Sequence, residues 1–342
     1  MFGIIHLLID ATTVTVIFAT RTFHGLSVRE GVMLVLFYDL IAFAGQAPLG
    51  LLIDRFRIWR ATALVGIALS AASMLFLTSG PNAAMILAGV GNAAFHVGAG
   101  ALSLHVHPGR ATPPGVFIAP GALGLAAGTM IGKGGAYVAW PFLVALLIAF
   151  VVAWLAEAPE VRTDRSESVP TISKSAAIIM LLLFSISLRA LLGKAGAIEL
   201  PRESTVLFGV ATAAFAGKAI GGILSDRWGW LEVSVGALLI SGLLFAFGDA
   251  NPVMITFGMF LFQMTTPVTL VATAALLPGR PALAFGLNCL ALTAGFLSHF
   301  FRVFEDYYLW WGQILMVLLS TTAVFMALRA LKGRIPMKFQ KI

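Results

Sequence analysis

The sequence has few charged residues for its length. Only 11% of its 342 residues are Asp, Glu, Lys or Arg. A typical soluble domain has about 25%. Hydrophobic residues make up 59% of the chain, and the mean hydropathy is +0.97. Such a chain cannot cover its surface with side chains that suit water. The composition therefore excludes a soluble enzyme, a secreted domain and a disordered chain, and it indicates a helical protein with several membrane crossings.

Cysteine is almost absent, and the motifs of common enzymes are missing. The one cysteine, Cys289, lies in an apolar run, which excludes a disulfide framework and a cysteine zinc site. The sequence has no catalytic triad, phosphate-binding loop or metal-ligand cluster, so we expect neither an enzyme nor a bound cofactor. The net charge of +7 lies mostly in short loops, where it indicates membrane orientation rather than nucleic-acid binding.

Twelve apolar segments are candidates for membrane crossing, since a spanning helix needs about 20 residues. They are 1–20, 31–53, 61–79, 83–105, 114–132, 138–156, 173–193, 203–224, 231–248, 252–277, 281–301 and 308–329. The first lacks the basic start and the small-residue cleavage site of a signal peptide, so we expect it to be retained. The predicted fold class is an all-α membrane protein with twelve transmembrane helices.

One connection differs from the others. Residues 157–172 are polar and charged and contain two prolines. We therefore predict an N-terminal six-helix bundle at 1–156, a linker at 157–172 and a C-terminal six-helix bundle at 173–342. If the N-terminus is cytoplasmic, the inner loops and the C-terminal tail hold most of the Lys and Arg residues. This bias predicts that both termini are cytoplasmic.

A short motif occurs twice, at the ends of segments two and eight. The copies are Gly50-Leu-Leu-Ile-Asp54-Arg55 and, 172 residues further on, Gly222-Ile-Leu-Ser-Asp226-Arg227. A repeat at half the chain length is typical of a duplicated, pseudo-symmetric transporter. Such a duplication places the ligand site near the membrane midplane, between the two halves.

The first copy, with Arg60 further on, resembles the loop signature of the major facilitator superfamily of secondary transporters. The resemblance implies the fold of that family, alternating access, and a gate that locks the cytoplasmic side in one conformation. It assigns the gate to Gly50, Asp54, Arg55 and Arg60, with a weaker second gate at Asp226 and Arg227. A carboxylate that faces a helix N-terminus gains about 0.3–1 kcal/mol from the helix dipole.

This chain departs from the signature just after the aspartate. Arg57 and Ile58 stand where the family pattern has a glycine and further basic residues. We therefore expect a looser lock on the cytoplasmic side.

Three patches resemble a narrower branch, the fosmidomycin-resistance exporters, which are driven by protons. The patches are His6-Leu-Leu-Ile-Asp10, Gly89-Val-Gly91-Asn92-Ala-Ala-Phe95-His96 and Leu276-Leu277-Pro278-Gly279-Arg280. The resemblance implies a monomer that exports a small compound through a bacterial-type inner membrane. The branch has proline and glutamate after the segment-four histidine, whereas this chain has Val97 and Gly98. If that glutamate handles substrate or protons, we expect the substrate or the coupling to differ.

Four charged residues fall inside the apolar segments: Asp10, Asp39, Arg189 and Lys218. Each costs about 2.5–3.5 kcal/mol at a helix centre, so each needs a partner or water. His6 and Asp10 are four residues apart and share a helix face. We expect Asp10 to carry the proton and His6 to tune it, the alternative being a structural polar pair. Asp39 is either a second proton site or the partner of Arg189 or Lys218.

Two further segments supply candidate substrate contacts. Asn92 and His96 share a face of segment four and are expected to contact the substrate or relay protons. Ser185 and Arg189 share a face of segment seven, and a guanidinium suits bidentate binding of a carboxylate or phosphonate. An outer gate salt bridge is the alternative role for Arg189.

Segment ten carries a polar stripe that we expect to form a cavity wall. Its members are Gln263, Thr266, Thr269 and Thr273. Lys218 corresponds in the repeat to Gln46 of the first half, so we assign Lys218 to the inner gate.

The sequence thus predicts proton-coupled export of a small organic compound, with Arg189 favouring an anion. One alternative is a divalent-metal carrier or uniporter that uses His6, Asp10, Asp39 and His96, since imidazole and carboxylate suit such ions. A second is a receptor or scaffold without flux, which the short loops disfavour. The expected partners are the substrate, the proton and the lipid bilayer, with no nucleic acid.

Overall fold

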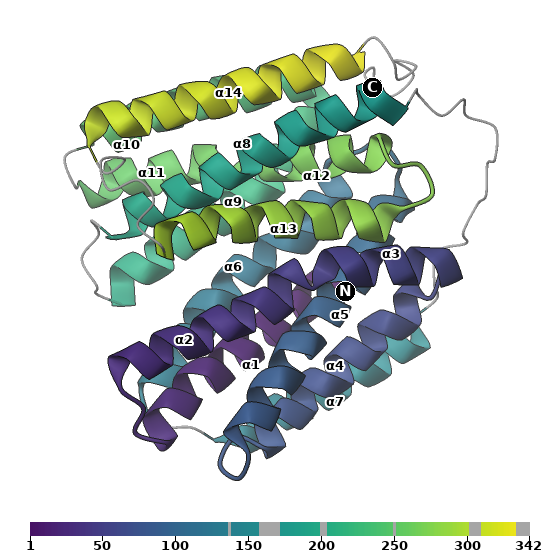
Figure 1. Ribbon diagram of the computed structural model, residues 1–342, viewed down its shortest axis with the longest axis vertical. Helices are drawn as coiled ribbons and strands as arrows, with labels where there is room; N and C mark the ends of the chain where they lie inside the picture. The colour runs from purple at the N-terminus through teal and green to yellow at the C-terminus, as the bar shows by residue number, and fades with distance from the viewer. Residues whose placement is uncertain (136–137, 157–171, 199–203, 249–250, 301–308, 333–342) are drawn as a thin grey trace. The chain divides into compact units, whose positions relative to one another are not determined.

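The computed structural model describes residues 1–135, 138–156, 172–198, 204–248, 251–300 and 309–332. Every regular element within these ranges is a helix (Figure 1). The helices are α1 (Phe2–Phe23), α2 (Val28–Asp39), the π-helix η1 (Leu40–Ala44), α3 (Gln46–Phe56), α4 (Trp59–Leu75), α5 (Pro81–Val106), α6 (Thr112–Lys133), α7 (Ala139–Leu155), α8 (Ile172–Ile198), α9 (Ser204–Trp228), α10 (Trp230–Phe247), α11 (Pro252–Gln263), α12 (Thr266–Ala275), α13 (Pro281–Phe300) and α14 (Trp310–Lys332).

Ten stretches within the described residues are long and apolar enough to cross a membrane. Two of them are broken helices, because α2 to α3 and α11 to α12 each form one stretch. The shorter apolar helices α4 and α7 lie where segments three and six were predicted. The prediction of a helical, multi-pass membrane protein is confirmed, while the number of twelve crossings and the orientation of the termini stay predictions.

The two broken helices have identifiable causes. In segment two, a π-helical turn of five residues lies between α2 and α3. In segment ten, Pro267 has no N–H to donate to the carbonyl of Gln263, so the helix is interrupted there. Such breaks are tolerated inside a membrane bundle because neighbouring groups satisfy the freed backbone.

The chain forms two compact units. The first comprises Met1–Leu102, Pro120–Pro159 and Arg280–Gly286, and the second comprises Ser103–Ala119, Glu160–Gly279 and Leu287–Ile342. Relative to the predicted halves, the start of α13 joins the first unit and the start of α6 joins the second. The predicted bundle boundaries stay a prediction, and residues 157–171 of the predicted linker lie outside the described residues.

In the first unit, α1 lies at close range to α6 through glycine. A Cβ on Gly124 would lie 2.4 Å from the carbonyl oxygen of Leu7, and one on Gly128 would lie 2.5 Å from that of Ala11. A larger residue at either position would force the two backbones apart. These glycines on α6 therefore serve close helix packing, as small residues commonly do in membranes.

In the second unit, α14 lies along α8 and α10 (Figure 1). A hydrogen bond of 2.7 Å joins the hydroxyls of Ser185 and Ser320 across α8 and α14, and both side chains are buried. The pairing satisfies two polar groups that would be costly to leave unpaired in an apolar interior.

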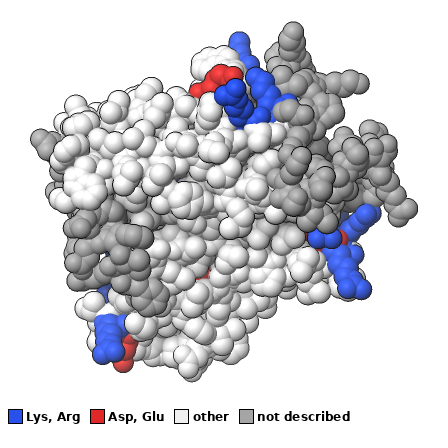
Figure 2. Space-filling model, turned by 45° about the horizontal axis from the view of Figure 1, so that its top comes forward, with Lys and Arg blue, Asp and Glu red and all other residues white. Residues whose placement is uncertain are grey.

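The outer surface is suited to lipid. Figure 2 shows charged side chains in a few small groups, with uncharged surface between them. Large apolar side chains are exposed, among them Leu155 at 75%, Val253 at 76% and Trp140 at 66%. In water these residues would favour aggregation, whereas lipid tails accept them.

Candidate functional site

A polar cluster in the first unit joins α1 and α5. Nε2 of His6 lies 2.7 Å from Nε2 of His96 and 3.1 Å from Oδ2 of Asp10. Nε2 of His96 lies 3.4 Å from Oδ1 of Asp10. Each of the three residues is only 5% exposed. We refer to His6, Asp10 and His96 as the α1–α5 cluster.

A second layer of polar groups holds the cluster in place. Nδ2 of Asn92 donates to Oδ1 of Asp10 at 3.1 Å, and it lies 3.3 Å from Oγ1 of Thr13. The hydroxyl of Tyr38 on α2 donates to the same Thr13 oxygen at 3.0 Å. Asn92 of α5 thus holds the carboxylate directly, and Tyr38 of α2 joins the same network through Thr13.

The tautomer of His96 follows from its partner. Nδ1 of His96 lies 2.8 Å from the backbone oxygen of Asn92, and a carbonyl oxygen only accepts hydrogen bonds. Nδ1 therefore carries a proton and donates it. In the neutral form of His96, Nε2 is left with a lone pair that points at His6 and Asp10.

Gly121 on α6 closes the cluster. A Cβ at this position would lie 2.4 Å from Nε2 of His6 and 2.6 Å from Oδ2 of Asp10. Any other residue here would push its side chain onto the polar atoms of the cluster. Only glycine leaves them their present arrangement.

The cluster brings together three of the four residues that the sequence offers as ligands of an alternative metal carrier. His6, Asp10 and His96 together could hold an ion. His6 and His96 are 90 positions apart and meet only through helix packing. Asn92, expected at the substrate, here holds Asp10. Asp39, half-buried at the end of α2, is not among the three clustered ligands.

The second unit contains a buried cation. Arg189 on α8 is 6% exposed, and its Nη2 donates to Oγ1 of Thr269 on α12 at 3.1 Å. Within the described ranges Arg189 forms no salt bridge, and its Nε has no hydrogen-bond partner. A buried charge without a counter-charge is expensive, so this guanidinium is a strong candidate for binding an anion.

The polar stripe of segment ten continues from Arg189. Oγ1 of Thr269 donates to the backbone oxygen of Thr266 at 3.0 Å, and Oγ1 of Thr266 donates to Oε1 of Gln263 at 3.1 Å. The fold therefore brings Arg189, Thr266 and Gln263 into one network through Thr269. Ser185, expected on the same face, instead bonds to Ser320 on α14.

Asp54 caps a helix far away in the sequence. Its carboxylate accepts hydrogen bonds from the backbone N–H groups of Ala282 at 3.1 Å and Leu283 at 2.8 Å, in the first turn of α13. Nε1 of Trp59 also donates to it, at 2.8 Å. Gly50 makes room for this approach, since a Cβ there would lie 2.5 Å from the Ala282 oxygen.

Asp226 repeats the arrangement in the second unit. Its carboxylate accepts from the N–H groups of Ala111 at 2.7 Å and Thr112 at 2.8 Å, where α6 begins. Nε1 of Trp230 donates to it at 3.3 Å. A Cβ on Gly222 would lie 2.6 Å from the Ala111 oxygen. The sequence repeat therefore corresponds to a repeated capping geometry.

The capped helices are preceded by a second repeat that sequence analysis missed. Pro-Gly-Arg occurs at 108–110 and at 278–280. Gly109 and Gly279 have φ values of 79° and 74°, so each glycine makes the same left-handed turn before its helix. The tryptophan donors were missed as well, although each follows its aspartate within five residues.

Arg57 occupies a backbone conformation that favours glycine. Its φ is 54°, and it is the one non-glycine residue with positive φ in the described part of the chain. The corresponding position in the second copy is Gly229, with φ of 110°. A left-handed turn at the position of Arg57 favours glycine, which is the residue that the signature has there.

The remaining gate candidates differ in their surroundings. Arg55 and Arg227 are exposed. Arg60 donates from Nη2 to the backbone oxygens of Ala153, at 3.2 Å, and Trp154, at the C-terminal end of α7. Lys218 is half-buried on α9. Arg60 therefore binds the negative end of a helix dipole, and its gating role stays a prediction.

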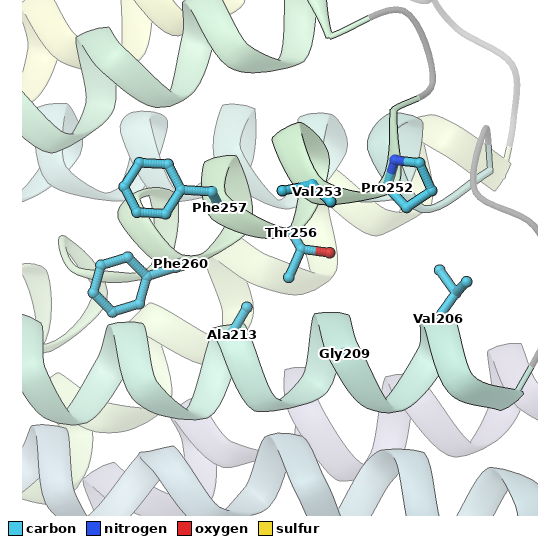
Figure 3. A pocket seen from close by; sticks show the side chains of 8 residues that line it. All are labelled: Val206, Gly209, Ala213, Pro252, Val253, Thr256, Phe257 and Phe260. Carbon is cyan, nitrogen blue, oxygen red and sulfur yellow. The ribbon is translucent and has the colours of Figure 1, made fainter.

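An apolar hollow of about 460 Å³ lies between α9 and α11 (Figure 3). Val206 and Ala213 line it from α9, and Thr256, Phe257 and Phe260 line it from α11. It has no titratable lining residue among those that the structure describes. Neither the cluster nor Arg189 lines this hollow.

Comparison with known proteins identifies the fold. No protein-family model and no curated protein sequence matches the chain. The fucose:proton symporter of E. coli, a major facilitator superfamily transporter, superposes with a TM-score of 0.67 at 12% identity, covering 98% of this chain and 100% of its own. The chain has the major facilitator fold.

Two further transporters share this fold. A human organic anion transporter has a TM-score of 0.67 at 13% identity, covering 96% of this chain and 99% of its own. A bacterial homologue of the iron transporter ferroportin has a TM-score of 0.61 at 15% identity, covering 97% and 98%. Identities this low establish the fold alone, and the fosmidomycin-resistance branch stays a prediction.

Proposed function

We propose that the protein is a secondary active transporter that works by alternating access and couples substrate movement to protons. The observation that carries the proposal is the α1–α5 cluster, which buries one carboxylate with two imidazoles in apolar helices. Ionisable groups inside membrane segments are rare, and they commonly mark ion or proton pathways. A polar pair that only anchors helices would not need three titratable groups.

The cluster has the chemistry of a proton carrier. Two imidazole nitrogens 2.7 Å apart repel each other unless a proton lies between them. His96 already carries one proton on Nδ1. A further proton on its Nε2 would face Oδ1 of Asp10, and the positive charge of the ring would then balance the negative charge of the carboxylate. The cluster can therefore gain and lose a proton without breaking its frame of Asn92, Thr13 and Tyr38.

We further propose that the substrate is a small organic anion and that Arg189 binds it. A guanidinium can offer two parallel N–H donors to a carboxylate or phosphonate, and the unpartnered Nε of Arg189 is one such donor. The human neighbour's description as an organic anion transporter agrees with this assignment. Gln263 and Thr266 are the nearby polar groups that would discriminate among anions.

Asp54 and Asp226 are proposed as the two gates. The partner amides of Asp54 belong to the predicted C-terminal half, and those of Asp226 belong to the predicted N-terminal half. If the two halves rock, both caps break together. Breaking them exposes first-turn N–H groups, and water then replaces the carboxylate as their partner.

We also propose that the protein is a monomer and exports its substrate across a bacterial-type inner membrane. Both of its termini then lie in the cytoplasm. These features depend on the resemblance to the fosmidomycin-resistance branch and on the distribution of Lys and Arg.

The second candidate function is that of a divalent-metal carrier, which the donor atoms of the α1–α5 cluster favour. Metal as the cargo would make Arg189 irrelevant to transport.

Sealed proteoliposomes with a pH-sensitive dye inside would test the proposal. The compounds to add are small carboxylates, phosphonates, neutral sugars and divalent metals. We expect one class of anion to change the internal pH in the wild type, no change in Asp10→Asn, and a normal change in Glu232→Gln, which alters a carboxylate at the start of α10. Anion flux without any pH change would contradict proton coupling, and metal flux that survives Arg189→Gln would favour the metal carrier.

A further inference from the structure

The donor atoms of the α1–α5 cluster are those of a transition-metal site. It presents two imidazole nitrogens and one carboxylate from buried residues. This combination suits Zn²⁺ and related first-row ions. It does not suit Mg²⁺ or Ca²⁺, which take sets of oxygen ligands. The class of ion follows from the ligands.

The spacing of the donors agrees with one ion between them. Tetrahedral zinc with bonds of about 2.0–2.1 Å places neighbouring ligands about 3.3 Å apart. In the cluster the two Nε2 atoms lie 2.7 Å apart, Oδ2 of Asp10 lies 3.1 Å from Nε2 of His6, and Oδ1 of Asp10 lies 3.4 Å from Nε2 of His96. One ligand atom from each residue can be chosen so that all three lie within 4.8 Å of one another, and side-chain rotation would bring them to one ion.

The orientation of the ligands is also set in advance. His96 donates its Nδ1 proton to the carbonyl of Asn92, which directs the lone pair of Nε2 inward. The side chain of Asn92 holds Oδ1 of Asp10. Metal-binding histidines and carboxylates typically have such outer partners, and losing one costs about 10–100-fold in affinity or activity.

The cluster offers one negative charge to a divalent ion. Beside the three ligands lie the Thr13 hydroxyl, which links the cluster to the Tyr38 hydroxyl of α2, and the backbone of Gly121 on α6. These neighbours are uncharged at neutral pH, since a tyrosine has a reference pKa of about 10. The single negative charge of Asp10 would offset half of the charge of the ion, which leaves a net charge of one.

We propose that His6, Asp10 and His96 bind one divalent transition-metal ion of the Zn²⁺ class in competition with protons. Nε2 of His6, Nε2 of His96 and the carboxylate of Asp10 each form a bond to the ion. A histidine that is protonated on both nitrogens releases its Nε2 proton to solution when the ion binds, whereas a neutral histidine holds its one proton on Nδ1. The site gains a charge of +2 with the ion and loses a charge of +1 with each proton released.

The proposal shares its residues with the proposed proton site, but it requires neither flux nor an organic substrate. If proton-coupled transport is also correct, Zn²⁺ competes with the transported proton and inhibits that flux. If transport of organic compounds fails in every assay, the equilibrium binding of metal to the purified protein remains a separate measurement.

Isothermal titration of the purified full-length protein with ZnCl₂ would test the site. It is run in two buffers of different ionisation enthalpy, so that the released protons are counted. We expect one Zn²⁺ per chain, proton release that increases and affinity that falls with acidification, and no heat with MgCl₂. His24→Gln removes a surface histidine that bonds to the Leu77 oxygen, and it should bind Zn²⁺ as the wild type does.

Ligand variants decide between this site and adventitious binding. Asp10→Asn and His96→Gln should each weaken Zn²⁺ binding more than tenfold, whereas His96→Cys should keep it, because a thiolate also ligates zinc. The cysteine variant keeps the test informative if His96→Gln does not fold. No binding by the wild type, or unchanged affinity in both ligand variants, would overturn the proposal.

Discussion

Replacing Asp54 with asparagine tests the proposed gate, because the expected loss can be calculated from the structure. The carboxylate accepts from two backbone N–H groups of α13, and asparagine offers only one acceptor oxygen. A hydrogen bond to a charged group contributes about 1.5–3 kcal/mol. Asp54→Asn should therefore lose about 2 kcal/mol of cap energy. This loss agrees with the roughly 0.5–2 kcal/mol that an N-terminal cap contributes, together with the attraction of the helix dipole for the charge.

A loss of about 2 kcal/mol raises the equilibrium constant for opening about 30-fold, since about 1.4 kcal/mol corresponds to a factor of ten. Hydrogen exchange with mass spectrometry would measure this at the amides of Ala282 and Leu283, which the carboxylate protects. Their exchange should accelerate about 30-fold in Asp54→Asn and remain unchanged in Glu232→Gln. Unchanged protection of both amides in Asp54→Asn would refute the capping geometry as the source of stability.

The same experiment separates a gate from a local cap. If the two aspartate caps open together, Asp54→Asn should also accelerate exchange at Ala111 and Thr112, which Asp226 protects. A purely local cap would leave those amides as they are. Asp226→Asn is the reciprocal variant and should produce the mirrored result.

Three further predictions concern single positions. Arg57→Gly should raise the melting temperature of the detergent-purified protein, because a non-glycine residue in the left-handed region costs about 1–2 kcal/mol and glycine costs only about 0.5–1 kcal/mol in chain entropy. Gly229→Ala should lower the melting temperature for the same reason. Equal melting temperatures for both variants would contradict this account. Gly121→Ala should abolish pH-driven transport, since its methyl group would press on His6 and Asp10, whereas Gly236→Ala, with no neighbour within 4 Å, should retain transport. Arg189→Lys should raise the KM for an anionic substrate at least tenfold, because an ammonium cannot form the bidentate pair; an unchanged KM in initial-rate assays would argue that Arg189 binds no substrate.

Much of the α1–α5 cluster could be predicted helix by helix. The spacing of four residues places His6 beside Asp10 and Asn92 beside His96, because each pair shares a helix face. The meeting of the two pairs could not be predicted, since it depends on how α1, α5 and α6 pack. Gly121 belongs to a series of glycines at positions 121, 124, 128 and 132, but their spacing does not say which glycine faces the charged residues.

In segment two, the sequence could not predict which of two neighbouring residues reaches the cluster. Asp39 has the more obvious chemistry, yet the neighbouring Tyr38 reaches the cluster through Thr13. One residue along a helix rotates a side chain by about 100°, since a turn takes about 3.6 residues. The π-helical turn after Asp39 changes the register again, and sequence periodicity does not reveal it.

The gates were predictable in part. The repeat identified Asp54 and Asp226, and the resemblance implied that such a carboxylate faces a helix N-terminus. Which helices they cap was not predictable, because backbone amides have no sequence signature and lie 228 and 115 positions away. The repeated Pro-Gly-Arg turns were the available signal, since they mark the two helix starts that the aspartates cap.

The central claim is that Asp10 couples protons to the substrate, and it is tested most directly by comparing exchange with accumulation in one variant. Proteoliposomes containing Asp10→Asn are assayed for exchange of labelled against unlabelled substrate and for accumulation driven by a pH gradient. The account predicts that exchange continues, because the substrate site in the second unit is intact, and that the gradient no longer drives accumulation. Accumulation at the wild-type level in Asp10→Asn would contradict it.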